Sequence, residues 1–111
     1  MDRIEQYRTV VTRILEEFRD RVSSGDPIRY QLVKDVQNGH FLLICCGWEG
    51  HRYTYQTIYH IDIIDGKIWV QFDATDRPIV QELLAAGIPK TDIVLGEYPV
   101  EVRKHNGFAI G

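Results

Sequence analysis

The sequence predicts a two-layer α+β domain: an N-terminal helix, a four-stranded antiparallel meander sheet, a C-terminal helix and an irregular tail. Two local patterns indicate this fold. Residues 2–22 place apolar side chains at steps of three and four, as on one face of a helix. Residues 53–73 alternate in polarity around Asp65-Gly66, a dipeptide that favours tight hairpins. The 111 residues contain no linker or internal repeat, so we expect a single domain over 1–111.

The first helix is expected to begin at Asp2 and to end near residue 22. Asp2 can cap the helix, and Glu5 stands where a capping box places a carboxylate. The run from Ser23 to Pro27 is typical of a helix end. The buried stripe of this helix is expected to contain Ile4, Tyr7, Val11, Ile14 and Phe18.

The hairpin around Asp65-Gly66 is the clearest structural prediction. A two-residue turn pairs Ile64 with Lys67, Ile63 with Ile68, Ile61 with Val70 and Tyr59 with Phe72, and cross-strand partners share a face. The apolar sides of both arms therefore meet. The opposite, polar sheet face is predicted to carry His60, Asp62, Trp69, Gln71 and Asp73.

Two further strands are predicted over 28–36 and 40–48. The first has Ile28, Tyr30, Leu32 and Val36 on one face, and the second is apolar on both faces. Turns of two residues at both Asn38-Gly39 and Glu49-Gly50 would put the apolar faces of the first and third strands on opposite sides of the sheet. A three-residue loop over 49–51 with a glycine bulge would restore one core, and it would add Phe41, Leu43 and Cys45 to that core.

A second, shorter helix is expected after the hairpin. Thr75 or Asp76 is predicted to cap it, Pro78 lies in its first turn, and Gly87 stands just past its end. The remaining residues read as a loop-rich tail with an extended piece over 93–95.

Composition limits the classes of function. The formal net charge is −3 and the sequence pI is about 5.7, which argues against broad DNA binding through a basic surface. Cys45 and Cys46 are adjacent, so a mutual disulfide is not expected, and a reducing, cytoplasmic setting is favoured. The polar start lacks the apolar core of a signal peptide, and no apolar run is long enough for a membrane span.

Three groups of side chains are candidates for a functional site. On the polar face, His60, Asp62, Gln71 and Asp73 could hold a metal ion or form a base with its orienting carboxylate. The alternative, which is the more common case, is the solvated side of a half-buried sheet. No Cys or His pair has a zinc-ligand spacing, and no catalytic residue, metal ligand or cofactor is assigned.

An apolar group on the same face is predicted to bind a partner, because exposed aromatic patches are typical of interfaces. The alternative is that the chain's own tail or a helix covers it. Its members are Leu42, Ile44, Trp48 and Trp69.

The third group is basic and is the nucleic-acid candidate. Arg103, Lys104 and His105, with Arg52 and Lys67, are the only residues available for a phosphate-binding patch. Ordinary solvated charges are the alternative, and the acidic pI favours them.

The stretches HIDIIDGKIWVQFD, GWEG and AGIPKTDIVLGEYPVEVRKHNGFAI resemble the XisI family of cyanobacterial excision controlling factors. The resemblance covers nearly the whole chain. It implies a helix, a four-stranded sheet and a helical C-terminal part. It also implies a link to excision of the fdxN DNA element, and a companion called XisH whose fold resembles restriction-type nucleases.

The function expected from this resemblance is that of a non-enzymatic accessory factor. It would bind a XisH-like protein and form a homo-oligomer, and its contact with DNA would be indirect. Two alternatives stay open: a small metal-dependent hydrolase that uses His60, Asp62 and Asp73, and a weak DNA-binding module that uses the C-terminal basic cluster.

Overall fold

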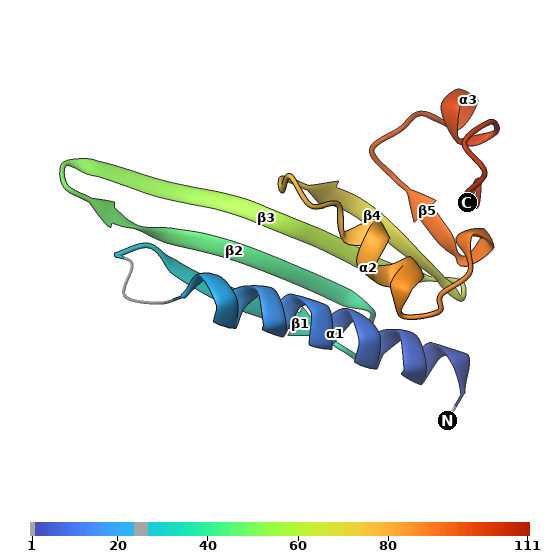
Figure 1. Cartoon of the computed structure of the whole chain (residues 1–111), viewed down its shortest axis with the longest axis horizontal. Helices are drawn as coiled ribbons and strands as arrows, with labels where there is room; N and C mark the ends of the chain where they lie inside the picture. Colours follow the sequence, from blue (N-terminus) through green and yellow to red (C-terminus); the bar gives the residue numbers. More distant parts are fainter. Residues whose placement is uncertain (1, 24–26) are drawn as a thin grey trace.

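The computed structural model describes residues 2–23 and 27–111 and shows one sheet with two helices packed on one face (Figure 1). The strand order is β1-β2-β3-β4-β5. The elements are α1 (Arg3–Val22), β1 (Arg29–Asp35), β2 (His40–Glu49), β3 (Arg52–Ile64), β4 (Lys67–Asp73), α2 (Ile79–Ala85), the 3₁₀ turn η1 (Lys90–Asp92), β5 (Ile93–Leu95) and α3 (Val100–Arg103).

The α+β class is confirmed, but the four-stranded, purely antiparallel sheet is wrong. The first four strands form the predicted meander, and β5 adds a fifth strand that runs parallel to β4. A parallel neighbour requires a crossover connection, and α2 supplies it. The sequence marked 93–95 as extended, but only the fold shows that Ile93 and Val94 are fully buried there.

Helix α1 matches its prediction. Asp2 caps it, because the Asp2 carboxylate accepts a hydrogen bond of 2.8 Å from the Glu5 backbone nitrogen. The turn predicted at 23–27 includes residues 24–26, which lie outside the described residues. Within 2–23 and 27–111, no helix is both long enough and apolar enough to cross a membrane. The side of α1 that faces the sheet buries Tyr7, Val10, Val11, Ile14 and Leu15.

The β3–β4 hairpin follows the predicted register only near its turn. Asp65 and Gly66 both have positive φ, and the predicted pairs of Ile64 with Lys67, Ile63 with Ile68 and Ile61 with Val70 are all present. Tyr59, however, pairs with Asp73 and not with Phe72, because Gln71 is an extra residue between two paired positions of β4. This bulge leaves Phe72 40% exposed.

A second bulge lies between β2 and β3. The connecting turn has two residues, Gly50 and His51, so the predicted three-residue loop is wrong. The additional residue is Ile58 inside β3: Leu43 pairs with Tyr59, and Ile44 already pairs with Thr57. The single core face is kept, as expected, but Tyr53 and Tyr55 move to the opposite face.

The core lies between the sheet and the two helices. Phe41, Leu43 and Cys45 belong to it, as predicted, and Tyr59 and Ile61 pair across from the first two. Three of the four residues predicted for the first strand pack against the core: Tyr30 and Leu32 in β1, and Ile28 just before it. The fourth, Val36, lies in the turn before β2 and is 36% exposed, because β1 ends at Asp35.

The predicted cap at Thr75 or Asp76 is wrong, because the side chain that bonds to the first turn of α2 is that of Asp73, the last residue of β4. Its carboxylate accepts hydrogen bonds from the Ile79 backbone nitrogen at 2.7 Å and from the Thr75 hydroxyl, also at 2.7 Å. Pro78 directly precedes the helix, and Gly87, with φ of 90°, follows its end as predicted. Because the Asp73 carboxylate is bonded to the start of α2, it does not join the polar residues of the sheet face, where it was predicted.

The C-terminal segment is tied both to the sheet and to α1. Ala109 bridges to Val94 in β5. The Tyr7 hydroxyl on α1 donates a hydrogen bond to the Asp92 carboxylate. Burial, and secondly this carboxylate, raise the pKa of Tyr7 to about 12, so the phenol stays a donor at neutral pH.

Candidate functional site

The sheet face opposite α1 and α2 carries a strip of apolar side chains that we call the open face. Register places its members side by side, since Trp48 pairs with Tyr53 and Cys46 pairs with Tyr55. The Trp48 and Tyr53 ring centroids are 5.1 Å apart. Trp48 is 62% exposed, Tyr53 51% and Tyr55 66%. The open face consists of Val33, Leu42, Ile44, Cys46, Trp48, Tyr53 and Tyr55.

Two of these residues, Tyr53 and Tyr55, are expected from strict alternation on the opposite, core face. Strict alternation along residues 53–63 assigned them to the core, and the bulge at Ile58 reverses that assignment. An additional residue within a strand leaves no local sequence signal. The parity of the two neighbouring turns did show that an odd residue was needed somewhere.

Trp69 lies on the predicted sheet face, because it pairs with Asp62, but it is not one of the exposed residues of the open face. The Arg103 guanidinium lies 5.2 Å from the Trp69 ring centroid. Gly96 and Gly111 also approach the ring, so the C-terminal segment covers Trp69 and leaves it half-buried. The alternative in which the tail covers the apolar patch therefore holds for Trp69, whereas Trp48 remains exposed.

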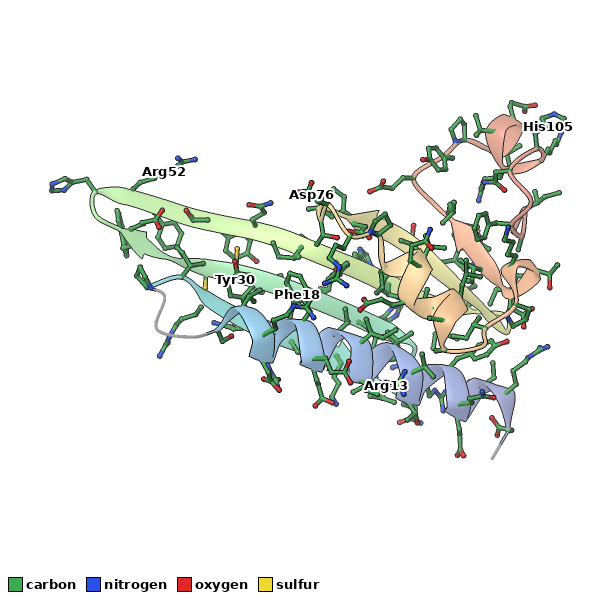
Figure 2. All side chains as sticks on the ribbon, viewed as in Figure 1. Arg13, Phe18, Tyr30, Arg52, Asp76 and His105 are labelled. Atoms are coloured by element: carbon green, nitrogen blue, oxygen red, sulfur yellow. The ribbon has the colours of Figure 1, made fainter. Side chains whose placement is uncertain are left out.

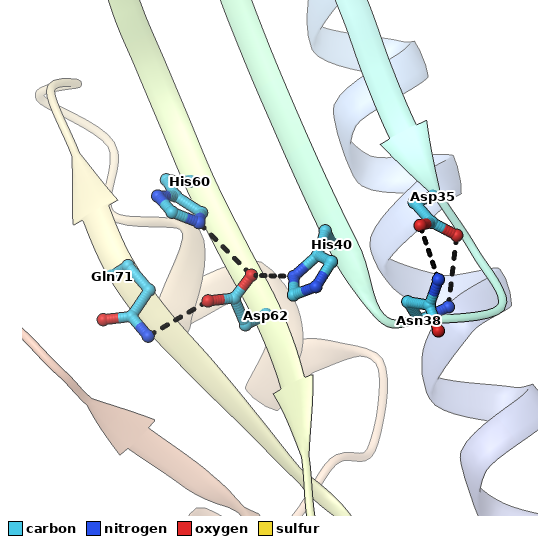
Figure 3. A network of polar contacts seen from close by, with 6 residues as sticks. All are labelled: Asp35, Asn38, His40, His60, Asp62 and Gln71. Carbon is cyan, nitrogen blue, oxygen red and sulfur yellow. Dashed lines mark hydrogen bonds and ion pairs between the residues drawn. The ribbon is translucent and has the colours of Figure 1, made fainter.

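A polar cluster lies beside the open face and joins β2, β3 and β4 (Figure 3). One Asp62 oxygen accepts hydrogen bonds from His40 Nδ1 at 2.9 Å and from His60 Nε2 at 3.2 Å. The other oxygen accepts one from Gln71 Nε2 at 3.1 Å. The predicted grouping of His60, Asp62 and Gln71 is thus present. His40 joins it because it pairs directly with Asp62 in the sheet.

The electrostatics of this cluster are those of a buried carboxylate held ionised by its donors. Asp62 is only 8% exposed, and this burial raises its pKa. Hydrogen bonds from His40 and Gln71 favour the charged form more strongly, so the pKa of Asp62 is lowered overall. The hydrogen bond to Asp62 raises the pKa of His40 in turn.

The metal-dependent alternative is not supported by this geometry. It needs His60, Asp62 and Asp73 together, and Asp73 instead holds the start of α2. Among residues 2–23 and 27–111, no group of three or more His, Cys, Asp or Glu side chains is placed to hold a metal ion. The Asp62 carboxylate accepts hydrogen bonds from two imidazoles and one amide, and these bonds connect strands β2, β3 and β4. This arrangement is typical of a structural role.

The predicted basic patch is divided in the fold. Figure 2 shows Arg52 and His105 at opposite ends of the molecule. Arg103 is stacked on Trp69, and Lys104 Nζ lies 3.9 Å from a Glu101 carboxylate oxygen. Of the five side chains, Arg103, Lys104 and His105 remain neighbours, and Arg103 and Lys104 already have partners.

The charge on His40 gives a direct test of the polar cluster. Asp62→Asn is expected to lower the pKa of His40 towards the ordinary value of about 6.5, because the partner anion is gone. Titration of the His40 ring followed by NMR measures this change. A raised histidine pKa stabilises the fold below pH about 6.5 and loses that effect as pH rises through the folded-state pKa. The destabilisation caused by Asp62→Asn should therefore be larger at pH 6 than at pH 8.5.

Asp65→Asn is a matched control for this experiment. It removes a carboxylate from the same hairpin, and asparagine suits the positive φ of 50° at this turn position. The His40 titration should be unchanged by Asp65→Asn. An unchanged His40 titration in Asp62→Asn as well would contradict the assigned pairing.

The structure is a two-layer α+β domain, and one face of its sheet exposes the aromatic side chains of Trp48, Tyr53 and Tyr55. The chain belongs to the XisI family: the model of the XisI protein family matches residues 1–110. The resemblance seen in the sequence is thereby confirmed.

Two crystal structures show the same architecture. One is the fdxN element excision controlling factor XisI from Anabaena variabilis ATCC 29413, with 36% identity, a TM-score of 0.85, and coverage of 99% of this chain and 100% of that one. The other is a XisI-like protein from the same organism, with 31% identity, a TM-score of 0.91, and coverage of 97% and 99%. Among curated proteins, none matches this chain.

Proposed function

We propose that this protein is a controlling factor similar to XisI that acts by binding another protein through its open face. The observation that carries the proposal is the exposure of Trp48, Tyr53 and Tyr55 side by side on one sheet surface. Tryptophan and tyrosine contribute the largest energies at interfaces, because they bury a large rigid area at a small entropic cost.

The partner that fits this role is a XisH-like protein with a nuclease-type fold, in the cytoplasm, in DNA element excision or a related process. Direct contact with DNA is disfavoured by the net charge of −3 and by the dispersal of the basic side chains. DNA would then be reached through the partner. The role that we propose is accessory and not catalytic.

Trp48→Ala tests the proposal. The Trp48 side chain is 62% exposed, so its removal should leave the fold intact and weaken partner binding at least tenfold, as at a typical hot spot of about 2 kcal/mol. The measurement is calorimetric titration of the variant with a XisH-like companion that is expressed and purified separately. Tyr98→Ala is the matched control, because Tyr98 is also a half-exposed aromatic residue but lies in the C-terminal segment.

If the wild type and Trp48→Ala bind the companion equally well, the open face is not the binding surface. Absence of any binding by the wild type would remove the XisH-like partner.

A further inference from the structure

Strand β3 is longer than the strand beside it. Strand β4 pairs with Tyr59–Ile64, and the Ala74 backbone nitrogen donates to the Ile58 carbonyl at 2.9 Å. Before Ile58, residues Arg52–Thr57 have β2 along one edge and no described strand along the other. Figure 1 shows this β2–β3 arm running past the end of β4.

The turn fixes which backbone groups face the free edge. Glu49 and Arg52 close a two-residue hairpin, in which the closing pair exchanges both of its hydrogen bonds. Arg52 therefore points its N–H and C=O towards β2. By alternation, Tyr53, Tyr55 and Thr57 point theirs outward. Among residues 2–23 and 27–111, these outward-pointing groups have no backbone partner, so they form a short row of unpaired donors and acceptors.

In the described part of the chain, this edge lacks the usual protection against pairing. Proteins guard free edges with lysine, proline, inward charges or a covering loop. Residues 53–57 read Tyr-Thr-Tyr-Gln-Thr, with no charge, proline or glycine and with high strand preference. The charge of Arg52 and the bulge at Ile58 mark the two limits of the segment. An edge of this kind is suited to receive another strand.

We propose that two copies of this chain pair antiparallel along this edge, with the two-fold axis at Tyr55. Tyr55 then faces Tyr55 of the second copy, and Tyr53 faces Thr57 of the second copy. All three outward-pointing residues gain partners in this register, whereas any shift leaves one of them unpaired. Because the segment is uncharged, self-pairing places no like charges opposite each other.

The pairing has a consequence for the open face. Trp48, Tyr53 and Tyr55 lie on one side of the arm, so the two arms would join their aromatic strips into one continuous surface. The dimer uses the edge of the arm and leaves the face available. It therefore stands independently of the partner proposed above, and both can be tested on separate samples.

The test uses two substitutions at the same position. Tyr55→Pro removes the outward N–H, and proline is tolerated on an edge strand where that group bonds to nothing within the chain. Tyr55→Thr removes the ring but keeps the N–H and the strand preference. In sedimentation velocity over a concentration series, the wild type and Tyr55→Thr should form dimers. Tyr55→Pro should dissociate at least tenfold more readily, with an unchanged far-ultraviolet circular dichroism spectrum.

Hydrogen exchange on the unmodified chain gives a second readout. The amides of Tyr53, Tyr55 and Thr57 should be protected at high protein concentration and exchange quickly at low concentration. The amides of Thr54 and Gln56 are directed to β2 and should be protected at both concentrations. This contrast within one strand does not depend on any variant folding.

Several outcomes would overturn the proposal. A wild-type chain that stays monomeric over the whole series, a Tyr55→Pro dimer of unchanged affinity, or exchange at Tyr53 and Tyr55 that ignores concentration would each do so. If the dimer forms but a XisH-like companion does not bind, the edge-pairing proposal stands and only the proposed partner is contradicted.

Discussion

Replacing Phe41 with alanine is expected to lower the free energy of unfolding by about 3–5 kcal/mol. Phe41 is fully buried and pairs across the sheet with Ile61, which is also fully buried. The loss combines the transfer free energy of the ring with the cavity that it leaves. Since small domains are stable by only about 5–15 kcal/mol, this single change should remove a large share of the total. Urea denaturation followed by circular dichroism measures it.

Phe72→Ala is the matched control in the same sheet. Phe72 is 40% exposed because the bulge at Gln71 turns it out of the core register. Its loss should cost roughly 1 kcal/mol or less. If Phe72→Ala were as destabilising as Phe41→Ala, the bulge in β4 would be placed wrongly.

Gly39→Ala is expected to cost more than about 2 kcal/mol. Gly39 has φ of 77°, which a side chain disfavours, and an added Cβ would lie 2.6 Å from the Ile63 carbonyl oxygen. That oxygen belongs to the backbone and cannot move alone, because the Ile63 nitrogen donates to the Gly39 carbonyl at 2.8 Å. The same denaturation experiment measures the effect.

Gly50→Ala separates the two causes. Gly50 also has positive φ, at 64°, but nothing lies within 4 Å of an added Cβ. Its substitution should cost only the conformational penalty of about 1–2 kcal/mol. The difference between the two variants isolates crowding against β3, and equal costs would show that the contact at Gly39 relaxes freely.

The parts of the fold that sequence reasoning predicted are those with a local cause. The cap at Asp2 and the turn at Asp65-Gly66 act within a few residues, so α1 and the start of the main hairpin follow from composition and spacing. The bulges at Ile58 and Gln71 have no such cause. Each bulge adjusts the register of one strand to that of its neighbour along their whole length. Alternation within a single strand cannot show this adjustment, so it misplaced Tyr53, Tyr55 and Phe72.

The strand missed in the sheet has a similar explanation. Residues 93–95 form β5 because α2 returns the chain beside β4, which is a property of the assembled layers. A three-residue strand is too short to show a period. Its burial against the core is visible only in the fold.

Within the candidate site, too, the sequence predicted the residues that are neighbours on one strand and missed those that depend on contacts between distant segments. His60 and Asp62 lie two residues apart on one strand, so their shared face followed directly. His40 depended on the β2–β3 register, and the covering of Trp69 depended on where the C-terminal segment lies. Asp73 was wrongly assigned to the sheet face. Its hydrogen bond with the Ile79 backbone nitrogen depends on the direction in which the chain leaves β4 towards α2, and the sequence does not show that direction.

The hydrogen bond between Tyr7 and Asp92 bears on how the chain is completed during synthesis. The two residues are separated by 85 positions, so the partner of the seventh residue leaves the ribosome only after most of the sheet has been made. Arg3 approaches the same carboxylate at 3.7 Å. The first turns of α1 are therefore secured after the strands on which this helix packs have been made. A nascent chain that stalls before residue 92 would leave the Tyr7 hydroxyl without this partner, although the strands and α2 that pack on α1 have already been made.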